Sequence, residues 1–224
     1  MSWSKKVVWS EGMFLQPQHF QQQDRHFEHA LETRVRWISP HPWGFSRLEL
    51  DQDALATGKI SITAARGVMT DGTPFDIPEH DAAPLSLAIP EKAKNQTLFL
   101  SIAKKRPGTV EIELATEGNE RKLRYQAEDV DVSDNTVSGG SVAPMRVAGL
   151  SVRLLLESEQ TDGWDGLGVA RIIERRADDQ VVIDAKFIPP CLTSRASPVV
   201  TAMIQELGDS EASVREMWGK FSFL

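Results

Sequence analysis

The sequence predicts a mainly β protein: an antiparallel β-sandwich with an N-terminal helix and a C-terminal helical extension. Apolar residues recur at a helical period before residue 38, alternate with polar residues in short segments between residues 60 and 187, and return to a helical period after residue 197. The short alternating segments follow one another through turns, with no helix between them. This order favours antiparallel pairing over a parallel sheet.

The N-terminal helix is predicted from about Pro17 to Ile38. Pro17 suits a first helical turn, and residues 39–44 hold two prolines and a glycine, which end a helix. The apolar residues form one stripe at a 3.6-residue period: Phe20, Phe27, Leu31, Val35 and Ile38. We expect Phe20, Phe27 and Leu31 to be core residues that fasten this helix onto the sandwich.

Strands are predicted where the period changes to two. Ile60 and Ile62 begin one strand, and the turn at Asp71-Gly72 leads into the next at residues 74–77. Residues 98–103 and 110–114 are predicted to form a hairpin, as are residues 169–175 and 181–187, and residues 150–156 a further strand. Residues 129–140, rich in Asp, Ser, Asn and Gly, are predicted to be an exposed loop.

Composition and charge narrow the class of protein. The chain has 224 residues, of which 41% are hydrophobic and 25% are charged, which is typical of a globular protein. The net charge of −7 has the wrong sign for a phosphate backbone, so we expect no nucleic-acid partner. No apolar run is long enough to span a membrane, the N-terminus lacks a secretory signal, and Cys191 is the only cysteine. We therefore expect a cytoplasmic protein without direct membrane insertion.

No catalytic pattern is complete. His19, His26 and His29 lie on the predicted first helix, but they lack the spacing and the third-ligand signature of a zinc helix. Cys191 follows two prolines and has no histidine nearby in the sequence. We predict no catalytic residue, no metal and no cofactor. A metal hydrolase built on the helix histidines, and a carbohydrate-binding or tail-spike-like sandwich, stay as alternatives.

The N-terminal segment is rich in large apolar residues outside any regular period. Aromatic residues and methionine are enriched in interface cores. We predict that five residues here bind a partner, with burial in the core as the alternative: Trp3, Trp9, Met13, Phe14 and Leu15.

Three blocks of the sequence resemble a known family. Residues 9–25 (WSEGMFLQPQHFQQQDR) are similar to the opening signature of TssK, the baseplate subunit of the bacterial type VI secretion system. Residues 40–45 (PHPWGF) and 65–78 (ARGVMTDGTPFDIP) resemble the next two blocks. The blocks span about the first third of the chain and occur in the family's order.

The resemblance implies a non-enzymatic cytoplasmic adaptor, trimeric, with a shoulder domain similar to that of phage receptor-binding proteins. It implies docking on the wedge subunits TssF and TssG, and contact with TssL and TssM through a C-terminal head. We expect residues 1–190 to be the shoulder and residues 191–224 the start of a helical neck, without the rest of the neck or the head. An apolar stripe in that neck is predicted to mediate oligomerisation: Val214, Met217, Trp218, Phe221 and Leu224.

Overall fold

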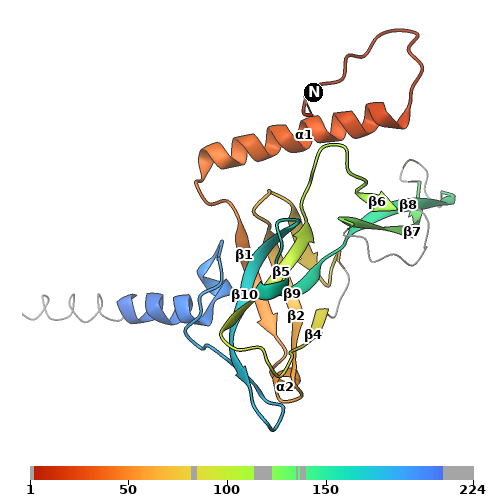
Figure 1. The fold of residues 1–224 in the computed structure, drawn as a ribbon. Coiled ribbons are helices and arrows are strands. Elements are labelled where there is room, and N and C mark those ends of the chain that lie inside the picture. The colour runs from red at the N-terminus through yellow and green to blue at the C-terminus, as the bar shows by residue number, and fades with distance from the viewer. Residues whose placement is uncertain (1–2, 82–84, 114–122, 135, 137–139, 209–224) are drawn as a thin grey trace, which may run out of the picture. The chain divides into compact units, whose positions relative to one another are not determined.

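The computed structural model describes residues 3–81, 85–113, 123–134, 136 and 140–208. The chain divides into two compact units (Figure 1). One comprises Met1–Pro42 with Arg106–Thr109, and the other comprises Trp43–Lys105 with Val110–Leu224. The predicted boundary at residue 190 lies inside the second unit and stays a prediction.

The first unit contains the long helix α1 (Pro17–Ile38), whose bounds are those predicted from the sequence. Pro17 occupies the first turn, where its missing N–H costs nothing. The helix ends as Ser39 turns to an extended conformation while its N–H still donates to the Val35 carbonyl at 3.0 Å. An arm of mostly irregular structure, residues 3–16, precedes the helix.

The second unit contains two four-stranded antiparallel sheets, as predicted. In the first, β1 (Gly44–Leu50), β2 (Lys59–Val68) and β3 (Pro74–Ile77) lie in this order, and β4 (Leu85–Ala88) also pairs with β2. The second has the order β11 (Val181–Ile183), β10 (Trp164–Arg175), β5 (Gln96–Ala103) and β9 (Arg153–Leu156). The short helix α2 (Gln52–Leu55) connects β1 to β2.

One hydrophobic core joins these two sheets. Ile60, Ile62 and Phe75 come from the first sheet, and Leu100 and Ile172 from the second; each of these side chains is at most 3% exposed. Successive side chains of a strand project to opposite faces of its sheet, so these apolar residues face the core and the polar residues between them face away from it. The two sheets therefore form the predicted sandwich.

The start of β1 is fixed by the chain that follows residue 189. Phe45 N–H donates to the Pro190 carbonyl, and Leu192 N–H donates to the Phe45 carbonyl, both at 2.8 Å. Gly44 has φ +131°, and a Cβ there would lie 2.7 Å from the Pro190 oxygen. Only glycine fits this close approach without a shift of the backbone.

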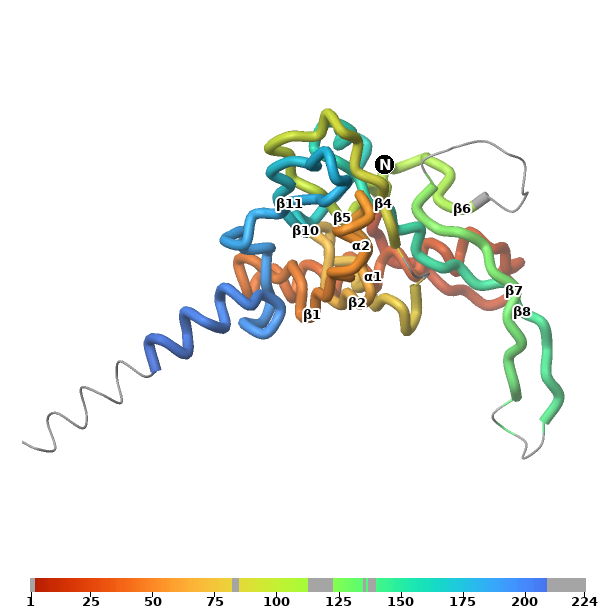
Figure 2. Tube along the Cα trace, turned by 90° about the horizontal axis from the view of Figure 1, so that it is seen from below, coloured from red at the N-terminus to blue at the C-terminus, as the bar shows by residue number. Residues whose placement is uncertain are grey.

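A third sheet extends from the sandwich. β7 (Tyr125–Ser133) pairs antiparallel with β8 (Val142–Leu150), and the two-residue strand β6 (Ile112–Glu113) pairs in parallel with the start of β7. Figure 2 shows β7 and β8 extending away from the two larger sheets. We call β7 and β8 together the ribbon.

Three predictions about strands were wrong. Residues 150–156 do not form one strand, because Leu150 ends β8 and β9 begins at Arg153. Residues 98–103 and 110–114 do not form a hairpin, because β5 pairs with β9 and β10 while Ile112 and Glu113 pair with β7. Residues 129–133 are not part of a loop, because they complete β7 opposite β8. The antiparallel pairing of β10 with β11, and of β2 with β3 across Asp71-Gly72, is confirmed.

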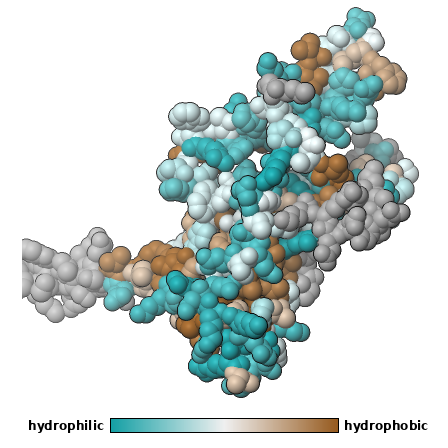
Figure 3. All heavy atoms as spheres, viewed as in Figure 1, coloured by the Kyte–Doolittle hydropathy of each residue, from teal (hydrophilic) through white to brown (hydrophobic). Residues whose placement is uncertain are grey.

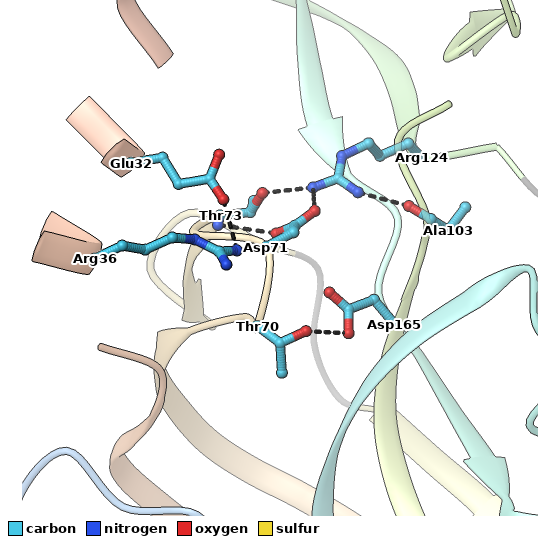
Figure 4. Close-up of polar contacts among 8 residues, drawn as sticks. All are labelled: Glu32, Arg36, Thr70, Asp71, Thr73, Ala103, Arg124 and Asp165. Carbon is cyan, nitrogen blue, oxygen red and sulfur yellow. Dashed lines mark hydrogen bonds and ion pairs between the residues drawn. The ribbon is translucent and has the colours of Figure 1, made fainter. Parts of the chain in front are cut away.

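Arg124 attaches the ribbon to the sandwich (Figure 4). Its side chain is 2% exposed and donates to the Ala103 carbonyl at 2.6 Å, to Asp71 Oδ2 at 2.6 Å and to Thr73 Oγ1 at 2.5 Å. Burial lowers the pKa of this guanidinium, but Asp71 and Tyr125 more than offset it, so the pKa is raised and the charge is kept. Nearby, Thr70 donates to Asp165, which ties the β2–β3 turn to β10.

Residues 198–208 are helical, as predicted from the start signal at Ser197-Pro198. Their large exposed apolar residues are Met203, Ile204 and Leu207, and Figure 3 shows the hydrophobic surface along this segment. The predicted oligomerisation residues Val214, Met217, Trp218, Phe221 and Leu224 lie outside the described residues. Among the described helices, none is long and apolar enough to cross a membrane.

Candidate functional site

The arm folds back along α1 through hydrogen bonds to its main chain. Gln22 Nε2 donates to the carbonyls of Lys5 at 2.6 Å and Trp3 at 3.2 Å. One helical turn later, His26 Nδ1 lies 3.0 Å from the Ser4 carbonyl and donates to it. The helix spacing of four residues puts both side chains on one face. The arm is therefore held by side chains that recognise its backbone.

Aromatic contacts fasten the same arm at two further points. The Arg25 guanidinium lies 4.5 Å from the centre of the Trp3 ring, a cation–π distance. Farther along the arm, the Trp9 ring lies 6.2 Å from His19 and 6.3 Å from Phe20. Trp3 and Trp9 thus pack against α1 while 36% and 47% of their surface stays exposed.

The arm reaches the helix through a tight turn and a capped first turn. Gly12 has φ +76°, which glycine adopts without strain. Gln16 N–H donates to His19 Nδ1 at 3.1 Å, so an otherwise unpaired N–H at the helix start is satisfied. His19 accepts this bond only as the neutral imidazole.

The structure divides the five predicted partner-binding residues into two groups. Trp3 and Trp9 contact α1, whereas Phe14 and Leu15 are 84% and 52% exposed, and Met13 is half-buried. An exposed phenylalanine next to an exposed leucine, presented by a fixed segment, is suited to fill an apolar pocket of a partner. That these residues bind a partner stays a prediction.

The apolar stripe of α1 is also exposed, which the sequence analysis did not expect. Phe20, Phe27 and Leu31 are 55%, 56% and 62% exposed, and no residue of α1 is buried. The expectation that these three side chains are core residues was therefore wrong. Trp37 and Ile38, at 86% and 84% exposed, extend the apolar surface and were missed as candidates. Their sequence signal was the adjacency of two large apolar residues at the helix end.

The helix histidines are not arranged as a metal site. His19 caps the helix and His26 binds the arm backbone. Within the part of the chain that the structure describes, no three His, Cys, Asp or Glu side chains come together as metal ligands.

The environment of Cys191 does not activate its thiol. Its Sγ donates to the Pro189 carbonyl at 2.9 Å, and burial raises the pKa of the thiol. A nucleophilic cysteine has a lowered pKa instead.

Comparison with known proteins identifies the family. Residues 19–215 match the family described as bacterial type VI secretion, VC_A0110, EvfL, ImpJ and VasE. The chain is 41% identical over 210 residues to the type VI secretion system baseplate component TssK1 of Pseudomonas aeruginosa, and it covers 46% of that protein's length. The match includes 92% of this chain.

Two solved structures share the fold. A crystal structure of TssK is 39% identical with a TM-score of 0.83, and the alignment covers 91% of this chain and 46% of that one. A chain in the TssK-TssF-TssG baseplate subcomplex, solved by cryo-electron microscopy, is 26% identical with a TM-score of 0.78. That alignment covers 91% of this chain and 67% of the other. The chain described here belongs to the TssK family of type VI secretion baseplate subunits.

Proposed function

We propose that this chain is an assembly adaptor in the baseplate of a type VI secretion system and that it acts by binding, without catalysis. The observation that carries the proposal is the exposed apolar arm in a member of this family. Phe14 and Leu15 are presented at 84% and 52% exposure on a segment fixed by Gln22, His26 and two tryptophans. A pre-ordered arm loses little conformational freedom on binding, which favours affinity.

The proposed partners of the arm are the wedge subunits TssF and TssG. A relative with the same fold occurs in a TssK-TssF-TssG subcomplex. The chain spans about half the length of the curated relative it matches. Contact with the membrane complex through TssL and TssM is therefore proposed for the family's C-terminal head and not for residues 1–224. We therefore propose that the protein acts in the cytoplasm.

Co-purification tests the wedge proposal. The chain is co-expressed with affinity-tagged TssF together with TssG from the same organism, and the complex is recovered and sized. We expect this chain to elute with the wedge subunits at a fixed ratio. Recovery no greater than that of an unrelated β-sandwich protein would overturn the proposal.

Trimerisation is proposed separately. We expect a weak, concentration-dependent trimer, with the stripe of Val214, Met217, Trp218, Phe221 and Leu224 in the contact. Sedimentation velocity over a hundredfold concentration range tests it. A species that stays monomeric throughout contradicts the proposal. A trimer unaffected by Trp218→Asp removes the stripe from the contact.

A further inference from the structure

The ribbon offers a second surface, separate in sequence from the arm. β7 and β8 make nine residue pairs, from Tyr125 with Leu150 to Ser133 with Val142. At about 3.4 Å per residue the ribbon is roughly 30 Å long. β6 pairs only with the first two residues of β7, and among the described strands none but β7 pairs with β8. A two-stranded ribbon is marginally stable in water, so a covering surface would stabilise it.

The two faces of the ribbon differ in chemistry. Pairs directly opposite each other project side chains to the same face. One face carries four apolar side chains that are each between 36% and 51% exposed, with Glu128 beside them: Val130 and Val132 from β7, and Met145 and Val147 from β8. Val142, at 56% exposed, lies on the other face. The other face carries Asp129 and Asp131, and Asp129 accepts from Arg146 at 2.8 Å.

The outer edge of β8 has unpaired main-chain groups. Two hydrogen bonds bracket the ribbon: Asp134 N–H donates to the Ser141 carbonyl, and Ser151 N–H to the Arg124 carbonyl. Hydrogen-bonded pairs alternate along an antiparallel ladder. In this register the N–H and C=O groups of Met145 and Val147 point to β7, and those of Arg146 and Ala148 point outward. No described residue pairs with the outward groups.

One residue already fits this assignment. Pro144, which has no N–H, occupies an outward position opposite Asp131, where proline costs no ladder bond. The edge beyond it, from Arg146 to Leu150, has no second proline and only one charged side chain. Natural proteins usually protect such edges with charges, bulges or cover, and this one has little protection.

Charge indicates what covers the edge. The ribbon, residues 125–133 and 142–150, holds three acidic residues and one basic residue, for a net charge of −2, and the whole chain has −7. A second copy would bring like charges together, and an anionic membrane or nucleic acid would be repelled. A basic polypeptide segment is attracted.

We propose that the outer edge of β8, from Arg146 to Leu150, is a strand-addition site for an extended segment of a protein partner in which apolar side chains alternate with Lys or Arg. Main-chain hydrogen bonds to Arg146 and Ala148 hold the segment. Its apolar side chains extend the face of Met145 and Val147, and its basic ones meet the acidic ribbon. The inference rests on the proposed function in one respect: the partner tested is the TssF–TssG subcomplex.

Amide hydrogen exchange at single-residue resolution tests the site. In the free chain the inward amides of Met145 and Val147 exchange slowly, and the outward amides of Arg146 and Ala148 exchange fast. With TssF–TssG bound, we expect the two outward amides to slow at least tenfold and the inward ones to change little. Outward amides that stay fast in a fully formed complex overturn the inference. Outward amides that slow without TssF–TssG, and more so at high protein concentration, also overturn it, because a second copy then occupies the edge.

A matched pair of variants gives an independent readout. Ala148→Pro removes one outward N–H and leaves the bonds to β7 intact, whereas Ala148→Ser keeps the N–H. We expect Ala148→Pro to weaken TssF–TssG binding about fivefold or more, the effect of one hydrogen bond of about 1 kcal/mol, and Ala148→Ser to bind like the unchanged protein. Slow exchange of Met145 and Val147 in both variants verifies that the ribbon is folded.

The outcomes separate this inference from the proposed function. If the unchanged protein fails to bind TssF–TssG, the proposed function fails. If it binds, and Ala148→Pro binds equally well with a folded ribbon, only the strand-addition site is refuted.

Discussion

Asp71→Asn should destabilise the protein strongly, because it removes the charge that faces the buried guanidinium of Arg124. The Arg124 side chain is 2% exposed and that of Asp71 is 24% exposed, and their closest atoms are 2.6 Å apart. Breaking a buried ion pair by removing one partner costs about 3 to 5 kcal/mol. Since Asp71 is partly accessible and asparagine can still accept a hydrogen bond, we expect the lower end, about 3 kcal/mol.

Urea denaturation followed by circular dichroism measures this loss of unfolding free energy. At about 2 to 4 °C per kcal/mol for a chain of this size, the melting temperature should fall by roughly 6 to 12 °C. The matched control is Asp129→Asn, which removes a carboxylate from the exposed pair with Arg146 and should leave the midpoint nearly unchanged. A loss in Asp71→Asn no larger than in this control would refute the reasoning.

A second change checks that the cost arises from an unpaired charge. Combining Asp71→Ala with Arg124→Met removes both partners, and apolar replacement of a whole buried pair is often nearly neutral. The double variant should therefore be more stable than the sum of the two single losses predicts. Because Arg124 directly precedes β7, ribbon amides should exchange faster in Asp71→Asn before the core does.

Three further predictions concern single side chains. Gln22→Ala should raise the rate of amide exchange in residues 4–8, because it releases the Lys5 and Trp3 carbonyls. Gln21→Ala, which changes a neighbouring glutamine with no such contact, should leave that rate unchanged. Equal exchange rates in the two variants would contradict the role of Gln22. The hydrogen bond from Arg146 lowers the pKa of Asp129, so the stability that this pair contributes is fully present above the ordinary aspartate pKa and is lost as the pH falls through the lowered value. Carbon NMR titration should show a higher Asp129 pKa in Arg146→Gln. An unchanged pKa would remove Arg146 as the cause. Burial raises the pKa of Cys191, so its thiol should react slowly with iodoacetamide at pH 7.5 in the folded protein and much faster in urea; equal rates would show that the folded site does not protect the thiol.

Local patterns in the sequence were sufficient for the elements whose partners are close along the chain. Pro17 determined the start of α1, and the prolines after its apolar stripe determined the end. The turns at Asp71-Gly72 and at residues 177–180 determined the pairing of their flanking strands. In each case the spacing of apolar residues, together with a turn or helix-stop signal within about ten residues, was enough to predict the element.

Pairing between distant strands could not be read in this way. β5 pairs with β9 and β10, more than fifty residues later, although a turn and an alternating segment follow it directly. The acidic residues of β7 suggested a loop, yet Val130 and Val132 alternate with Asp129 and Asp131, which is a strand pattern. The prediction of a loop gave the turn-forming composition of this segment more weight than its alternation of apolar and polar residues.

The candidate site was predictable in part. Apolar residues ahead of the helix indicated an interface, and Phe14 and Leu15 are indeed exposed. The attachment of the arm to its own helix was missed, because the contacts of Gln22 and His26 join residues 17 to 22 positions apart. The spacing of Gln22 and His26 by one helical turn was the available signal. Nothing in the sequence distinguishes Arg124 from the chain's exposed arginines.

The affinity of Phe14→Ala/Leu15→Ala for purified TssF–TssG tests the central claim most directly. The control is Ile188→Ala, which truncates an exposed apolar residue outside the arm. Interface hot spots contribute about 2 kcal/mol or more, so titration calorimetry should show at least roughly thirtyfold weaker binding for the double variant. Its melting temperature should match that of the unchanged protein, and the control should bind normally. An affinity of the folded double variant within about twofold of the unchanged protein would contradict the claim that the arm docks the chain on the wedge.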